Sequence, residues 1–149
     1  MVHAWMSNQC VYPKEIKAMH RLLYLFGLVL LLQLTACGHS PGPEEVAAET
    51  AKAYYEQLLH GKYDQFVDGR YFPDSIPGSY REQLIANAKM FVGEQQEQHK
   101  GISEVRIANA QADTSTHTAN VFLTFVYGDS TKEEVLVPMV EHRGVWYRR

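Results

Sequence analysis

The spacing of apolar positions in the middle of the chain predicts an amphipathic helix from about Pro43 to His60. Apolar residues recur there every three or four positions, which places them on one face of a helix. Glu44 and Glu45 complement the positive end of the helix dipole, and Gly61 is the expected stop. The predicted apolar face consists of Ala47, Ala51, Tyr54, Tyr55, Leu58 and Leu59.

A second long helix is expected to begin at Ser79. Ser79 and Glu82 have the spacing of a capping box, in which each side chain hydrogen-bonds the backbone beside the other. Gly101 is suited to closing the helix, because glycine readily adopts the left-handed conformation found there. The predicted buried stripe is Leu84, Ile85, Ala88, Phe91 and Val92.

The segment between the two helices is apolar as well. Residues 63–67 predict a short helix or turn, with Tyr63, Phe66 and Val67 directed inward. Residues 68–78 predict a loop, because glycines and prolines interrupt them repeatedly. Such an apolar loop usually folds over a core or lines a cavity.

After Gly101 the apolar period becomes two, which is typical of strands. Strands are expected around Val105 and Ile107, at residues 116–127, at 134–142 and at 145–148. Within the third, Pro138 indicates an edge or bulged strand, because proline cannot donate to a sheet hydrogen bond. One face of the second should carry Val121, Leu123, Phe125 and Tyr127.

This order of elements predicts the fold class. N-terminal helices followed by four antiparallel strands indicate an α+β domain, in which the helices pack on one face of a curved four-stranded meander. Residues 44–149 are long enough for one such domain and too short for two.

A basic and then apolar segment near the start predicts export. Lys14, Lys17 and Arg21 precede an uninterrupted apolar run at residues 22–32. A membrane-spanning helix needs about 20 such residues, so this run is too short. Basic residues, a short apolar run and then small residues form the pattern of a secretory signal.

The run leads into Leu34-Thr35-Ala36-Cys37, which resembles the lipobox of bacterial lipoproteins. The resemblance implies cleavage between Ala36 and Cys37 and acylation of the Cys37 thiol. With Gly38 next, it also implies a lipid anchor in the bacterial cell envelope, at the outer membrane and facing the periplasm. An ordinary signal peptide, or a single-span anchor with a chance cysteine, remains the alternative.

These patterns divide the chain into three parts. Residues 1–36 are the leader and signal peptide, 37–43 a lipidated tether and 44–149 the domain. Residues 1–18 are outside the natural product if translation begins at Met19, which directly precedes the signal.

The domain and its tether have an acidic balance. Residues 37–149 contain 11 basic and 16 acidic residues. Nucleic-acid binding is not expected, since it needs basic patches that neutralise phosphates. Arg143, Arg148 and Arg149 form a small basic group, interpreted as a solvated strand end. With Cys10 in the leader and Cys37 lipidated, no disulfide is expected.

Three segments resemble the nuclear-transport-factor-2-like (NTF2-like, cystatin-like) family, and small bacterial lipoproteins of unknown function within it. They are AKAYYEQLLHGKYDQFVD at residues 51–68, HTANVFLTFVYGDS at 117–130 and RGVWYRR at 143–149. The resemblance implies a cone-like roll of curved sheet around a helix, with a cavity open at one end. It does not imply an activity, because this fold carries enzymes and binding modules alike.

Catalysis on this fold would need a carboxylate base and an oxyanion donor beside the cavity. Asp64, Asp68 and Asp74 are the candidates for the base, yet their spacing does not reproduce an isomerase site. The tyrosine candidates for the donor are Tyr54, Tyr55 and Tyr80. The histidines lack metal-ligand spacing, so neither a metal nor another cofactor is expected.

Aromatic residues are the one hint of a binding pocket, although they could equally fill the core. The candidate pocket residues are Tyr54, Tyr55, Phe66, Phe72, Tyr80, Phe91 and Trp146.

We therefore expect a lipid-anchored envelope protein that acts as a non-catalytic small-ligand-binding or protein-interaction module. The alternative is an isomerase- or dehydratase-like enzyme that uses a cavity carboxylate and a tyrosine. The expected partners are the membrane, through the acyl chains, an apolar small molecule or an envelope protein, and a second copy of the chain.

Overall fold

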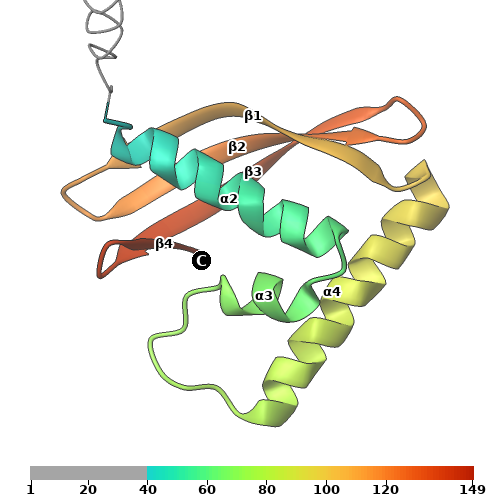
Figure 1. The fold of residues 1–149 in the computed structure, drawn as a ribbon, viewed down its shortest axis with the longest axis horizontal. Coiled ribbons are helices and arrows are strands. Elements are labelled where there is room, and N and C mark those ends of the chain that lie inside the picture. Colours follow the sequence, from blue (N-terminus) through green and yellow to red (C-terminus); the bar gives the residue numbers. More distant parts are fainter. Residues whose placement is uncertain (1–39) are drawn as a thin grey trace, which may run out of the picture. The chain divides into compact units, whose positions relative to one another are not determined.

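A computed structural model describes residues 40–149 of the chain. The signal segment 1–36, cleavage after Ala36 and lipidation of Cys37 lie outside the described residues and stay predictions. Within the described part, three helices precede four strands (Figure 1). The helices are α2 (Pro43–Leu59), α3 (Tyr63–Asp68) and α4 (Gly78–His99). The strands are β1 (Ile102–Asp113), β2 (Thr118–Tyr127), β3 (Lys132–His142) and β4 (Val145–Arg148).

The strands form an antiparallel meander in the order β1-β2-β3-β4. Neighbours in sequence are neighbours in the sheet, so every connection is a short turn. The β1–β2 register shifts at Ile102/Glu104 and at Ile107/Asn109. Such irregularities increase the local twist of a sheet and help it to curve. The α+β architecture predicted from the sequence is confirmed.

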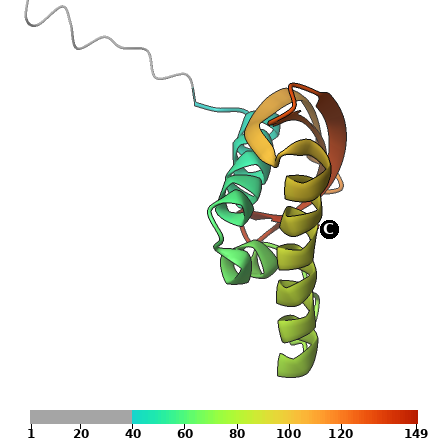
Figure 2. The ribbon, with the colours of Figure 1, turned by 90° about the vertical axis from the view of Figure 1, so that its right-hand side faces the viewer.

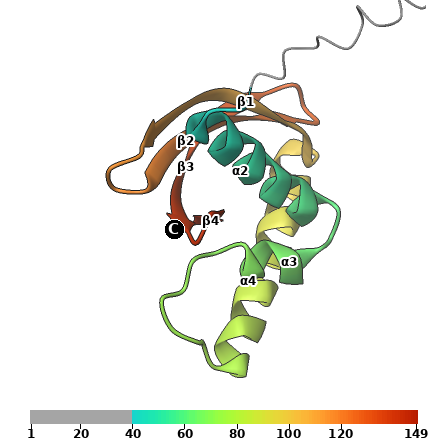
Figure 3. The same ribbon diagram turned by 60° about the vertical axis from the view of Figure 1, so that its left-hand side comes forward.

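Helix α2 lies on the concave side of the curved sheet (Figures 2 and 3). Ala47, Ala48 and Ala51 of this helix are buried, and their small side chains allow the helix backbone to approach the strands closely. The strand residues predicted to share one face of β2 are buried beneath the helix. The core from the sheet comprises Val105, Ala119, Val121, Leu123, Phe125, Tyr127, Val137, Met139 and Trp146.

Pro138 marks the point at which β3 becomes an edge strand. β4 pairs with β3 only from Met139 to His142, so residues 132–138 have β2 as their strand partner. The Pro138 carbonyl accepts a hydrogen bond from the Arg149 amide at 2.9 Å, on the side where proline has no donor of its own. The edge interpretation holds for this half of β3. No register shift interrupts the β2–β3 pairing, so the bulge is not present.

Helix α4 begins one residue earlier than the sequence predicts. Pro77 is its N-cap and Gly78 its first residue, and no side chain caps this end. The expected capping box of Ser79 and Glu82 is therefore not formed. The ring of Pro77 fixes its φ at a value that suits the residue before a helix. Pro77 can therefore occupy the N-cap position without a side-chain hydrogen bond.

The first half of α4 extends away from the sheet, together with the loop that precedes it (Figures 1 and 2). Of its predicted buried stripe, only Ala88 is fully buried, while Leu84, Ile85, Phe91 and Val92 remain half-buried. The apolar face of α4 is thus only partly covered by the sheet and α3. No helix among residues 40–149 combines the length and apolar character that crossing a membrane requires.

Candidate functional site

A cavity of about 290 Å³ lies where α3, α4 and the end of β4 meet. It is open to solvent and forms beside the partly covered face of α4. Its apolar walls are Phe66, Val67, Leu84, Ala88 and Phe91, and its polar lining groups are Arg70, Asn87 and Arg148.

Main-chain hydrogen bonds place the two arginines at this cavity. The Tyr71 amide donates to the Arg148 carbonyl at 2.7 Å, and the Arg148 amide donates to the Gly69 carbonyl at 2.9 Å. Arg70 and Arg148 thereby form an isolated parallel bridge. The segment after α3 and the last strand of the sheet are joined at the residues that carry the two guanidinium groups.

The guanidinium of Arg148 is held among aromatic rings. Its central carbon lies 3.4 Å from the centroid of the Phe66 ring, 5.7 Å from that of Tyr54 and 5.9 Å from that of Tyr55. Nη2 donates to the main-chain carbonyl of Phe66. Nε is buried and meets no hydrogen-bond acceptor. The aromatic faces stabilise the cation and fix the plane of its donors.

No carboxylate neutralises this arginine among the described ion pairs. Burial lowers the pKa of Arg148 to about 10, and the charge of Arg70 acts in the same direction. The Tyr55 and Tyr54 hydroxyls partly offset this shift of the pKa. Arg148 is still a cation at neutral pH, so the cavity is lined by a half-buried positive charge, and the exposed Arg70 lines it as well.

A second hollow of about 340 Å³ lies on the other side of Arg70, between the loop 69–77 and the β3–β4 turn. The apolar loop therefore does line a cavity, as its composition suggests. Tyr71 packs against His142 and Tyr147, with ring centroids 5.4 Å and 6.2 Å away. The lining residues are Arg70, Tyr71, Phe72, Pro73, His142, Arg143 and Tyr147, and none of them is acidic.

The structure separates the predicted pocket residues into different environments. Phe66 and Phe91 line the 290 Å³ cavity, and Phe72 lines the second hollow instead. Trp146 is buried in the core. The predicted place of Tyr80 in the pocket is corrected. Tyr80 is 41% exposed in the first turns of α4, where the helix extends away from the core.

Tyr54 and Tyr55 belong to the boundary between core and cavity. Tyr54 donates from its hydroxyl to the Trp146 carbonyl at 2.9 Å. Tyr55 lies between Phe66 and Phe125, with ring centroids 5.4 Å and 5.1 Å away. Both tyrosines therefore support the groups that surround Arg148.

The candidate carboxylates do not enter the cavity. Asp64, Asp68 and Asp74 are all exposed. Asp68 accepts two hydrogen bonds from the Arg81 guanidinium, at 2.9 Å and 2.8 Å, on the surface. No Asp or Glu lines either hollow in the described part of the chain, so the pairing of a base with a tyrosine hydroxyl is not formed there. Among residues 40–149, no three potential metal ligands come together.

Arg148 is the site residue that the sequence interpretation placed in solvent. The alternation of β4 could have located it, because Trp146 and Arg148 are two residues apart and face the same side of the strand. A tryptophan directed into the core therefore predicts that Arg148 points inward too. Arg143 and Arg149 are exposed, as expected of a strand end.

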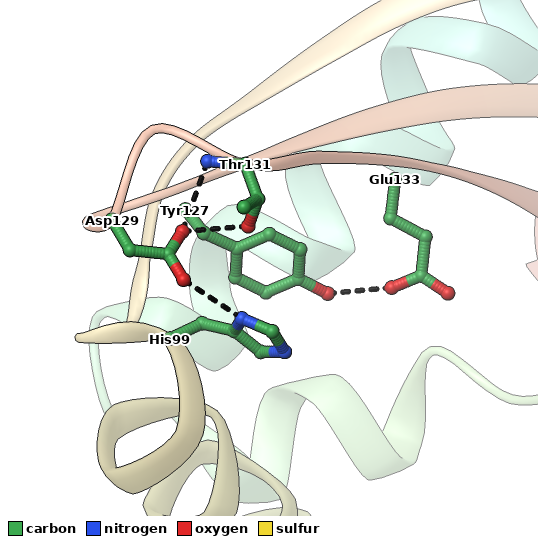
Figure 4. Close-up of polar contacts among 5 residues, drawn as sticks. All are labelled: His99, Tyr127, Asp129, Thr131 and Glu133. Carbon is green, nitrogen blue, oxygen red and sulfur yellow. Dashed lines mark hydrogen bonds and ion pairs between the residues drawn. The ribbon is translucent and has the colours of Figure 1, made fainter.

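A separate polar cluster holds the end of α4 against the β2–β3 turn (Figure 4). Asp129 accepts hydrogen bonds from the Thr131 amide and hydroxyl and contacts His99 Nδ1 at 3.0 Å. The Thr131 hydrogen bonds, with help from His99, lower the pKa of Asp129 to about 2. The Tyr127 hydroxyl donates to Glu133 at 2.6 Å. Burial, together with this contact, raises the pKa of Tyr127 to about 12. We interpret the cluster as structural, since its contacts join the end of α4 to the β2–β3 turn.

A solved structure resembles this domain in fold, and another aligns with it more weakly. A Campylobacter jejuni protein, provisionally described as an NTF2-like transpeptidase, aligns with a TM-score of 0.56 at 9% identity, covering 67% of this chain and 94% of that one. A SEC-C motif containing protein from Rhodopseudomonas palustris aligns with a TM-score of 0.47 at 13% identity, covering 69% of this chain and 76% of that one.

No protein-family model matches the sequence, and no curated protein matches it significantly. At 9% identity the Campylobacter structure is informative about the fold alone. Helices followed by a curved four-stranded antiparallel sheet, together with this alignment, show that the domain has the NTF2-like fold.

Proposed function

We propose that the domain is a non-catalytic small-ligand-binding module, held at the bacterial cell envelope by acyl chains on Cys37. The observation that carries the proposal is the open cavity of about 290 Å³, with apolar walls and without a carboxylate among its lining residues. Ligand sites are usually preformed concave surfaces of this kind, with a few polar groups that orient the occupant.

The enzyme alternative has less support. A general base must lie within hydrogen-bond reach of the proton that it removes. The three candidate aspartates are exposed, no tyrosine among residues 40–149 lines the cavity, and the Tyr54 hydroxyl already donates to the Trp146 carbonyl. The cavity groups that carry charge are arginines, which hold anions rather than abstract protons.

Calorimetry with a small apolar probe tests the ligand-binding proposal. Octanol would be titrated into the processed protein in lipid nanodiscs, with empty nanodiscs as the blank. Ala88→Phe places a ring in the cavity and is expected to remove the binding heat. Met90→Phe is the matched control, because Met90 lies on the same helix and is 59% exposed. Equal heats for both variants, or no heat for the unsubstituted protein, would rule the proposal out.

The anchor is tested separately. Cys37→Ser removes the thiol that would carry the lipid. Detergent phase separation should then move the processed protein from the detergent phase to the aqueous phase. Mass analysis of the N-terminal peptide of the unsubstituted protein should find acyl chains, and an unmodified thiol there would contradict the anchor.

Association of two copies is a second candidate role, favoured by the open part of the sheet. Residues 132–138 of β3 have one strand partner only, and Leu136 in this stretch is 50% exposed. An uncovered edge with an apolar residue is a surface for pairing with another chain. Leu136→Lys should then convert a dimer to a monomer in analytical ultracentrifugation, and a monomeric unsubstituted protein would exclude this role.

A further inference from the structure

We infer that the cavity binds a small amphiphile whose anionic head group, a carboxylate or a phosphate, pairs with the guanidinium groups of Arg148 and Arg70. The inference rests on the proposed ligand-binding function and adds the chemical class of the ligand to it. Three features of the cavity carry it: an unneutralised, half-buried charge, a second cation that the main chain joins to the first, and apolar walls.

The first feature is the charge of Arg148, a half-buried residue whose Nε is buried. Removing a cation from water is costly unless an anion or a full set of hydrogen bonds replaces the lost solvation. Arg148 has one main-chain acceptor at Nη2, an unsatisfied Nε and aromatic rings around it. The domain and tether contain 16 acidic residues, yet none lines this cavity. An anionic ligand would supply the neutralisation that the chain itself does not.

The second feature is that the fold brings two like charges together. The Arg70–Arg148 bridge is made by the main chain, so the two side chains leave the backbone at neighbouring positions. The Arg70 side chain is exposed, and its guanidinium carbon lies 5.7 Å from the centroid of the Phe72 ring. Both arginines line the same cavity. Like charges at short range repel, and an anion between them relieves the repulsion on both. On the far side of Arg70, Arg143 extends the same positive character into the second hollow.

The third feature sets the size and polarity of the rest of the ligand. The walls formed by Phe66, Leu84 and Phe91 offer no hydrogen-bonding side chain. At roughly 30 Å³ for each water-sized group, the cavity accommodates about ten non-hydrogen atoms. A short alkyl or aryl chain with one anionic end fits both limits.

Arginine also suits the head group geometrically. Its planar fork of donors matches two oxygens of a carboxylate or phosphate, and such charge-assisted pairs are stronger than neutral hydrogen bonds. Stacking on the Phe66 ring restricts the plane of the Arg148 fork, so part of the ordering cost is met before the ligand arrives.

Titration of four octyl compounds tests the inference on the processed protein in nanodiscs, with empty nanodiscs as the blank. Octanoate and octyl phosphate carry an anion, octanol is neutral and octylammonium is a cation. We expect the better of the two anions to bind at least about tenfold more tightly than octanol, as a desolvated charge-assisted pair allows. Octylammonium should give no measurable heat. The order of octanoate and octyl phosphate identifies the head group, and either order supports the inference.

Arginine variants locate the effect. Arg148→Met should abolish the preference for the anion while keeping the affinity for octanol within about twofold. Arg70→Met should reduce the preference in part. Arg149→Met is the matched control, because Arg149 is the exposed neighbour of Arg148 and does not line the cavity. Arg148→Lys keeps the charge without the fork and should retain part of the preference, which gives a second result if Arg148→Met does not fold.

The outcomes separate this inference from the function on which it rests. If octanol and the anions bind equally, or if the arginine variants keep the preference, the inference is wrong and the ligand-binding function stands. If none of the four compounds binds, both fall. Tighter binding of octylammonium than of octanoate would also overturn the inference.

Discussion

The hydroxyl of Tyr54 in α2 donates to the main-chain carbonyl of Trp146 in β4 at 2.9 Å. The contact joins the first helix of the domain to its last strand. Arg148 follows Trp146 by two residues on the same strand, so the bond also fixes the strand that presents this arginine to the cavity. Core packing and the candidate site therefore share one structural support.

Replacement of Tyr54 by Phe tests this support. The change removes one hydrogen bond and leaves the Trp146 carbonyl without its donor, which should lower the free energy of unfolding by about 1 to 2 kcal/mol. Tyr63→Phe is the matched control, since the Tyr63 hydroxyl makes no hydrogen bond within residues 40–149, and should change stability little. Urea unfolding of the three proteins measures both effects, and equal losses would contradict the role of the Tyr54 bond.

Gly69 is a second point at which the site depends on close packing. A Cβ at this position would clash with the Tyr54 ring, and the φ of Gly69 is −73°, so the conflict is steric rather than conformational. Gly69→Ala should destabilise the domain by about 1 to 3 kcal/mol through overpacking. It should also weaken ligand binding, because the Gly69 carbonyl holds the Arg148 amide.

Gly93→Ala provides the comparison for that change. Gly93 lies inside α4, and a Cβ there meets no atom within 4 Å. Alanine should stabilise the helix by about 0.5 to 1 kcal/mol, because it loses less backbone entropy on folding. Thermal unfolding should therefore shift in opposite directions for the two glycines. A shift in the same direction would show that the space around Gly69 is not limiting.

The sequence predicts most of the elements because periodicity reports burial directly. Alternation through Val121, Leu123 and Phe125 can arise only in a strand with one buried face, and these residues are buried in β2. The start of α4 was misplaced because two signals compete there. Serine is a common N-cap residue, but Pro77 occupies the N-cap position here, so Ser79 lies inside the helix.

The candidate site was harder to predict, for two physical reasons. Helical spacing shows which residues share a face, yet it does not show how far the helix extends beyond the core, so Tyr80 was expected in a pocket that it does not reach. Charged residues are usually solvated. This rule misplaces Arg148, although the alternation of β4 directs its side chain inward with that of Trp146. Its main-chain bridge to Arg70, which lies 78 positions earlier in the chain, cannot be predicted from a local pattern.

Acid should weaken the β2–β3 turn and, with it, the contact of this turn with the end of α4. The pKa of Asp129 is lowered from its ordinary 3.8 to about 2, chiefly by the Thr131 hydrogen bonds. A lowered carboxylate pKa contributes stability that is present above pH 3.8 and is lost as the pH falls towards 2. Asp129→Asn should remove this part of the pH dependence. Unfolding curves for both proteins between pH 5 and about 2 measure it, and parallel curves would contradict the assignment.

Arg148→Met should reveal whether the site is maintained at the expense of stability. The Arg148 side chain is half-buried, and burial, together with the charge of Arg70, lowers its pKa to about 10, so the folded state holds the charge unfavourably. Methionine fills a similar volume among the same rings without a charge, and replacement of buried ionic groups by apolar ones is often stabilising by about 1 to 4 kcal/mol. Loss of the bond to the Phe66 carbonyl opposes this gain, so we expect a net increase of about 1 kcal/mol in the free energy of unfolding.

Denaturant unfolding without ligand measures the change, and Arg149→Met serves again as the control. A stabilised variant that no longer prefers octanoate to octanol would identify Arg148 as a residue retained for binding. A variant destabilised by several kcal/mol would show that the arginine is instead a structural support of β4.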